Sequence, residues 1–121
     1  MKGACLLLLA STLAVSLVAE SPAAGLWAGR FPDRLPAVTL QVKDEAGRLS
    51  GNVTFYVNRS GEIVGAETRP LIHPRFASQV LAFQVTRPSD GETLRFEMRL
   101  VNADEGELTG EGQVVKMKRV E

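Results

Sequence analysis

Residues 49–57 alternate between apolar or small side chains and polar ones. One set comprises Leu49, Gly51, Val53, Phe55 and Val57, and the other comprises Ser50, Asn52, Thr54 and Tyr56. A period of two, carried largely by β-branched and aromatic residues, is typical of a strand with one buried face and one solvent-exposed face. This stretch therefore requires a sheet whose apolar side is covered by other parts of the chain.

Comparable alternating segments recur along the chain and are separated by turns that contain glycine. We expect strands at 26–31, 38–43, 49–57, 62–67, 81–87, 93–101 and 107–120. The expected turns are 44–47, 58–61, 88–91 and 102–106. The least regular part is 68–78, where a short helical turn at 74–79 is one option.

No segment has helical periodicity of ordinary length, so the sequence predicts an all-β fold. Strand and turn units that follow one another every ~10 to 15 residues favour a small antiparallel up-and-down meander, either a barrel or a tight sandwich. We favour a barrel of seven or eight strands, because closure leaves no long edge strand exposed. Residues 26–121 would form this single domain, and 20–25 a flexible entry to it.

The first residues have the layout of a secretory signal peptide. Lys2 supplies a positive start, 4–18 are apolar and small, and 19–24 are small and polar. The apolar run is short for a membrane span of about 20 residues. We expect cleavage after Ala19, with Ser21 or Ala23 as near alternatives, and a secreted or periplasmic domain with no transmembrane anchor; an uncleaved anchor is the alternative. Cys5, the one cysteine, leaves with the leader 1–19, so no disulfide is expected.

Charge excludes some functions of the exported domain. Without Lys2, 13 basic residues stand against 14 acidic ones, so no global field would attract nucleic acid or anionic lipid. Lys116, Lys118 and Arg119 form a small basic terminus without interleaved aromatic residues, and nucleic-acid binding is therefore not expected. Arg95, Glu97 and Arg99 alternate along one strand, where cross-strand ion pairs with Glu107 and Glu111 are the expected role and a recognition patch is the alternative.

Gly25, Leu26 and Trp27 resemble the Gly-x-Trp signature of lipocalins and their calycin relatives. Residues 35–40, 70–76 and 81–85 are also similar to small secreted bacterial lipocalin-like proteins of undefined function. The resemblance implies an up-and-down barrel whose tryptophan plugs the closed end under a basic side chain from the last strand, here Arg119 or Lys118. The chain departs from the family in its shorter domain and in lacking both a C-terminal helix pattern and the disulfide.

The inward-facing aromatic residues and one methionine are the candidate ligand contacts. They are Trp27, Phe55, Phe83, Phe96 and Met98. A small barrel is usually filled by its own side chains, and an eight-stranded one has room for one small ligand. Both a filled core and a cavity therefore stay open, and Trp27 is either a core plug or part of a ligand wall.

Catalysis is not expected. His73 is the sole histidine, and a zinc or copper site would need ligands that the sequence does not provide. Ser78 and Asp90 lack any local signature of a catalytic triad. We expect no metal or cofactor.

Asn52 and Asn58 match the glycosylation sequon, which has meaning only in a eukaryotic source.

The expected function is that of an exported, monomeric, non-catalytic binding module for a small apolar ligand in the barrel interior. The alternative is an envelope or secreted structural protein with a filled core, whose outer face or 68–79 loop contacts another envelope protein.

Overall fold

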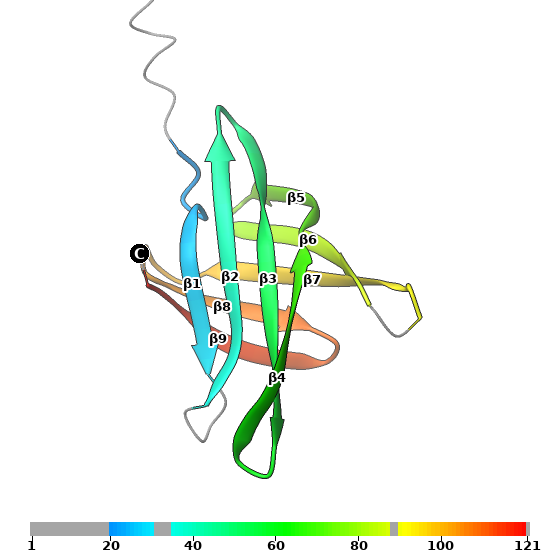
Figure 1. Cartoon of the computed structure of the whole chain (residues 1–121). Coiled ribbons are helices and arrows are strands. Elements are labelled where there is room, and N and C mark those ends of the chain that lie inside the picture. Colours follow the sequence, from blue (N-terminus) through cyan, green and yellow to red (C-terminus); the bar gives the residue numbers. More distant parts are fainter. Residues whose placement is uncertain (1–19, 31–34, 88–89, 121) are drawn as a thin grey trace, which may run out of the picture.

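The computed structural model describes residues 20–30, 35–87 and 90–120. They form one continuous antiparallel sheet (Figure 1). Its strands are β1 (Gly25–Arg30), β2 (Pro36–Glu45), β3 (Arg48–Arg59), β4 (Glu62–Pro70), β5 (Ile72–Ala77), β6 (Val80–Thr86), β7 (Thr93–Leu100), β8 (Glu105–Gly110) and β9 (Gln113–Arg119). The all-β meander predicted from the alternation is thus confirmed. Within the described part of the chain, no helix is long and apolar enough to cross a membrane.

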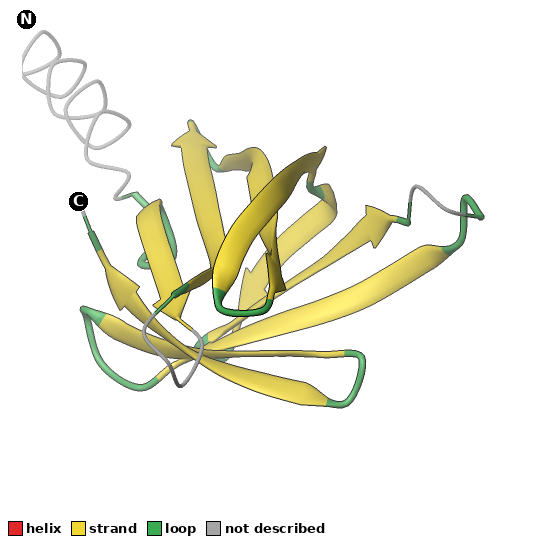
Figure 2. Cartoon of the chain, turned by 60° about the horizontal axis from the view of Figure 1, so that its bottom comes forward, coloured by secondary structure: helices red, strands yellow, loops and turns green. Residues whose placement is uncertain are grey.

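The sheet order is β4-β3-β2-β1-β9-β8-β7-β6-β5, so the first strand pairs with the last. β1 to β3 cross β6 to β9 at a steep angle (Figure 1), and the sheet curls into a half-barrel (Figure 2). Among the described strands, no ladder joins β4 to β5, although only Leu71 separates them. The Leu71 N–H instead donates to the Gly51 carbonyl at 3.0 Å. The half-barrel therefore opens between two strands that are consecutive in the chain.

The structure has nine strands where the sequence predicts seven or eight. The expected last strand is two strands, β8 and β9, because the chain turns at 111–112. The helical turn considered at 74–79 is wrong, since β5 occupies most of it. β5 has an irregular register between Ile72 and Arg75, with His73 at a φ of 51°. Pro74 is tolerated there because β5 is an edge strand.

Alternate residues of the strands meet inside the curl and form the core. Trp27 lies opposite Leu40 on β2, and Leu40 lies opposite Val53 on β3, so these three form one row. The largest fully buried side chains are Trp27, Leu40, Leu81, Met98, Met117, Val53 and Val85. Close packing of this kind fills the middle of the half-barrel.

Glycine is required where Phe96 approaches the neighbouring strand. A Cβ on Gly110 would lie 2.2 Å from Cδ2 of Phe96, far inside contact distance. The missing side chain thus provides the space that the Phe96 ring occupies. The inner surface alternates large and small residues, as expected for a small, tightly curved sheet.

Candidate functional site

The five candidate ligand contacts divide into two groups. Trp27 and Met98 are fully buried and Phe83 is 2% exposed, so their side chains have little surface left for a ligand. Phe55 and Phe96 border a hollow in the surface instead. Their ring centroids are 5.4 Å apart, and Phe83 stacks on the other side of Phe96 at 5.6 Å.

The hollow beside these rings, here called the Phe55–Phe96 hollow, has a volume of about 430 Å³. Its apolar lining comes from β2, β3, β7, β8 and β9, and comprises Ala37, Val38, Phe55, Phe96, Leu108 and Val115. Three polar residues also contribute to its lining: Tyr56, Glu111 and Gln113. An apolar lining with a few polar groups is the usual composition of a small-molecule site.

Arg87 connects the turns at this end of the molecule. Its guanidinium lies 3.5 Å from the Glu111 carboxylate in the β8–β9 turn, and it donates to Asp90 at 3.1 Å and to Glu92 at 2.7 Å. These hydrogen bonds raise the pKa of Arg87 above its ordinary value. The pKa of Asp90 is lowered, chiefly because its carboxylate accepts the Glu92 N–H and also the Arg87 side chain. Glu111 is thereby oriented beside the hollow by a permanent cation.

A second, more open groove of about 930 Å³ lies beside the N-terminal residues. Leu49, Phe76 and Val80 supply apolar sides, and residues 20–22 form one border. Asp44 lies on this border, where its carboxylate accepts the Ser21 N–H at 2.7 Å and the Gly47 N–H at 2.8 Å. Because both carboxylate oxygens are already used, Asp44 has a structural role here.

Trp27 is held from two sides, as the resemblance to lipocalins implies. Its Nε1 donates to the Ala23 carbonyl at 2.9 Å, and the Arg119 guanidinium lies 4.3 Å from its ring centroid. Arg119 also donates to the carbonyls of Pro22, Ala24 and Ala103. The basic cover is therefore Arg119, while Lys118 points to solvent. Trp27 is a core plug in this structure.

The residues considered for catalysis are not brought together. His73 is exposed on β5, Ser78 lies just before β6, and Asp90 lies after the other end of β6. In the described ranges, no three His, Cys, Asp or Glu residues are placed to hold a metal ion.

On the outer face, the expected ion pair between Arg99 and Glu107 forms at 2.8 Å, whereas Glu111 pairs with Arg87.

Comparison of the chain with protein-family models, curated proteins and solved structures found no match. The likeness to lipocalins, which rests on 25–27 and on the stretches 35–40, 70–76 and 81–85, therefore stays a prediction. Sequence reasoning found Phe55 and Phe96 but missed the contributions of Tyr56, Glu111 and Gln113. Glu111 and Gln113 lie in or beside a turn that the sequence placed inside a strand, and this misplacement hid their common position.

Proposed function

We propose that this protein is a non-catalytic binding module that holds a small, mainly apolar molecule in the Phe55–Phe96 hollow. The observation that carries the proposal is the combination of size and lining. A volume of about 430 Å³ lies within the range of roughly 300 to 1,000 Å³ that ligand sites occupy. The hollow also brings two aromatic rings and a few polar groups to one place.

The mechanism would be burial of apolar surface with a small polar contribution to orientation. Removing about 200 Å² of apolar ligand surface from water provides roughly 5 kcal/mol before the entropy of association is subtracted. The Gln113 amide both donates and accepts hydrogen bonds, and the Glu111 carboxylate accepts them. These groups favour a ligand with an apolar body and one hydroxyl or amide end.

The proposed location is outside the cytoplasm, since 1–19 resemble a cleaved leader. Such a module would carry or sequester its ligand in the periplasm or the medium. No reaction is required of it, and the Glu111 carboxylate beside the hollow is paired with Arg87.

Native mass spectrometry of the domain, purified from its own secretory compartment, tests this function. We expect an added mass that is lost on denaturation, and stabilisation by a member of a panel of fatty acids, isoprenoids and haem. Val115→Phe should fill the hollow and weaken binding at least tenfold. Val114→Phe is the matched control, because Val114 is the neighbouring residue and is 63% exposed on the other face of β9.

Gln113→Met provides a second variant that keeps the length of the side chain and removes its amide. It should weaken a ligand with a polar end while leaving the circular dichroism spectrum unchanged. A bare mass combined with no stabilisation by any member of the panel would contradict the binding module.

The second candidate function is that of an interaction protein, and the edge strand β4 favours it. Eight of its nine residues are exposed, including the large aliphatic residues Ile63 and Val64. An unpaired edge can accept an extended segment of another envelope protein by strand addition. Cross-linking from residue 64, compared with cross-linking from residue 101, would test whether a partner binds at this edge.

A further inference from the structure

A third hollow lies on the outer face of β5, β6 and β7, the side opposite to the buried Leu81, Phe83 and Val85. It has a volume of about 490 Å³ and is here called the outer hollow. Its polar or small lining residues are His73, Arg75, Ala82, Gln84, Arg95 and Glu97. The almost completely buried Phe83 and Phe96 also border it. Phe96 borders both this hollow and the Phe55–Phe96 hollow, but the two share no charged residue, so an anion site here does not depend on the apolar site.

The strand register places two arginines on either side of β6. Ala82 pairs with Arg75 on β5, and Gln84 pairs with Arg95 on β7. β5 and β7 are two strand spacings, roughly 10 Å, apart. Two extended arginine side chains span such a distance, so both guanidinium groups can reach a molecule above Ala82 and Gln84. Because the Ala82 side chain is small, it leaves space between Arg75 and Arg95.

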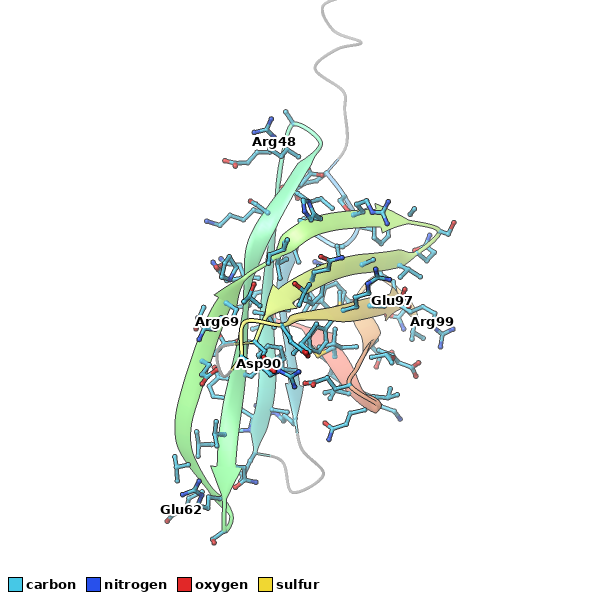
Figure 3. All side chains as sticks on the ribbon, turned by 90° about the vertical axis from the view of Figure 1, so that its right-hand side faces the viewer. Arg48, Glu62, Arg69, Asp90, Glu97 and Arg99 are labelled. Carbon is cyan, nitrogen blue, oxygen red and sulfur yellow. The ribbon has the colours of Figure 1, made fainter. Side chains whose placement is uncertain are left out.

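Several arginines of the described residues have a carboxylate partner, whereas Arg75 and Arg95, like Arg48 and Arg59, have none. Arg87, Arg99 and Arg119 each have an acidic oxygen within 4.0 Å. Within the part of the chain that the structure describes, Arg75 and Arg95 form no such pair, although Glu97 lines the same hollow. Glu97 projects from the outer face of β7 in Figure 3, near Arg99. The hollow therefore combines two unneutralised guanidinium groups with one carboxylate.

Guanidinium groups bind phosphate and carboxylate through paired N–H donors. The Gln84 amide adds a further donor, and Glu97 accepts a hydrogen bond from a hydroxyl or ammonium group. We propose that the outer hollow binds the anionic group, phosphate or carboxylate, of a small molecule that carries a hydroxyl or amino group beside it. Arg75 and Arg95 contact the anion, and Glu97 contacts the neighbouring donor.

The test follows the arginine Nε–H signals of the full mature domain by NMR during titration with glycerol phosphate. Sodium chloride at matched ionic strength measures the non-specific effect of salt. We expect saturable shifts of the Arg75 and Arg95 signals and no such shift of Arg48, an exposed arginine at the β2–β3 turn. Arg75→Gln and Arg95→Gln should each weaken binding about tenfold, since each removes a charge-assisted hydrogen bond.

Arg48→Gln is the matched control and should leave the affinity unchanged. Glu97→Gln should leave binding of inorganic phosphate intact or strengthen it, while it weakens glycerol phosphate relative to inorganic phosphate. Shifts that grow linearly with concentration, or that are equal at Arg48 and Arg75, would overturn the proposal. All four substituted residues are exposed, so circular dichroism should show an unchanged fold.

Two sources of the anion are separated by a vesicle experiment. A lipid headgroup is identified if the protein co-sediments with phosphatidylglycerol vesicles but not with phosphatidylcholine vesicles. Arg75→Gln and Arg95→Gln should then abolish this co-sedimentation. Saturable binding of free glycerol phosphate without co-sedimentation would identify a soluble ligand. Absence of both would refute the site.

Discussion

The Arg119 guanidinium lies 4.3 Å from the centroid of the Trp27 ring, and these two residues stand opposite each other on the last and first strands. The same guanidinium donates to Pro22 at 2.6 Å and to Ala103 at 3.0 Å. It therefore joins the N-terminal residues, the first strand and the β7–β8 turn. This contact closes the seam at which the two ends of the meander meet.

Replacing Arg119 by Lys should destabilise the domain by about 2 kcal/mol. Lysine keeps the charge but cannot donate from a planar fork to several carbonyls at once, and charged hydrogen bonds each contribute about 1.5 to 3 kcal/mol. Urea unfolding followed by Trp27 fluorescence measures the change. Lys118→Met is the control, and its exposed side chain predicts a change within about 0.5 kcal/mol. Equal effects of the two substitutions would contradict the closing role of Arg119.

A chain that begins at Gly25 should be less stable than one that begins at Glu20. The truncation removes the Ala23 carbonyl that accepts the Trp27 N–H, and a buried indole needs that partner. It also removes Pro22 and Ala24, two acceptors of Arg119. We expect a lower midpoint of thermal unfolding and a red-shifted Trp27 emission. N-terminal sequencing of the exported protein would show whether processing spares these residues, as cleavage after Ala19 predicts.

Gly110→Ala should destabilise the fold by about 1 to 3 kcal/mol, the usual effect of overpacking a core. The new methyl group would meet the Phe96 ring at 2.2 Å. Gly65→Ala is the matched control on β4, because no atom lies within 4 Å of the Cβ added there. Chemical denaturation of both variants measures the difference. Phe96→Leu should recover part of the loss in the Gly110→Ala background, and no recovery would mean that the strain lies elsewhere.

The contacts that join Arg87, Asp90 and Glu92 should loosen in acid. Asp90 has a lowered pKa in the folded protein, so its ionised form stabilises the turn above the ordinary aspartate pKa of about 3.9. This stabilisation is lost as the pH falls through the lower folded pKa, because the folded state then takes up the proton. Amide exchange at Gly91 and Glu92 should accelerate over that interval. Asp90→Asn should remove the pH dependence, whereas Glu62→Gln in the β3–β4 turn should preserve it.

Val64→Lys should slow aggregation without lowering stability. Val64 is 55% exposed on the edge strand β4, and a lysine at an edge opposes pairing with another chain. Light scattering just below the unfolding temperature measures the aggregation rate. Val101→Lys adds the same charge at a residue that is 57% exposed and lies outside the strands. An equal effect of both substitutions would point to net charge instead of the β4 edge.

The sequence alone determined the all-β class, the inward faces of 49–55 and 93–101, and the turns that follow β2 and β3. These are local properties, because a period of two and a glycine-containing turn are set by neighbours in the chain. It also indicated Trp27 as a plug and offered Arg119 as one of two covers. The choice between Arg119 and Lys118 required the register in which β9 pairs with β1. A shift of one residue in that register would move every side chain of β9 to the opposite face of the sheet.

Only the tertiary structure decided how the sheet closes and where hollows remain. β1 pairs with β9, while β4 and β5 stay apart around Leu71, and no local pattern records either relationship. The hollow beside Phe55 and Phe96 likewise depends on the fit between Gly110 and a ring from β7. Such contacts join residues far apart in the chain, and their geometry follows from the curl of the whole sheet. Alternation specifies which side chains turn inward, but the space left between them is fixed only when the strands pack together.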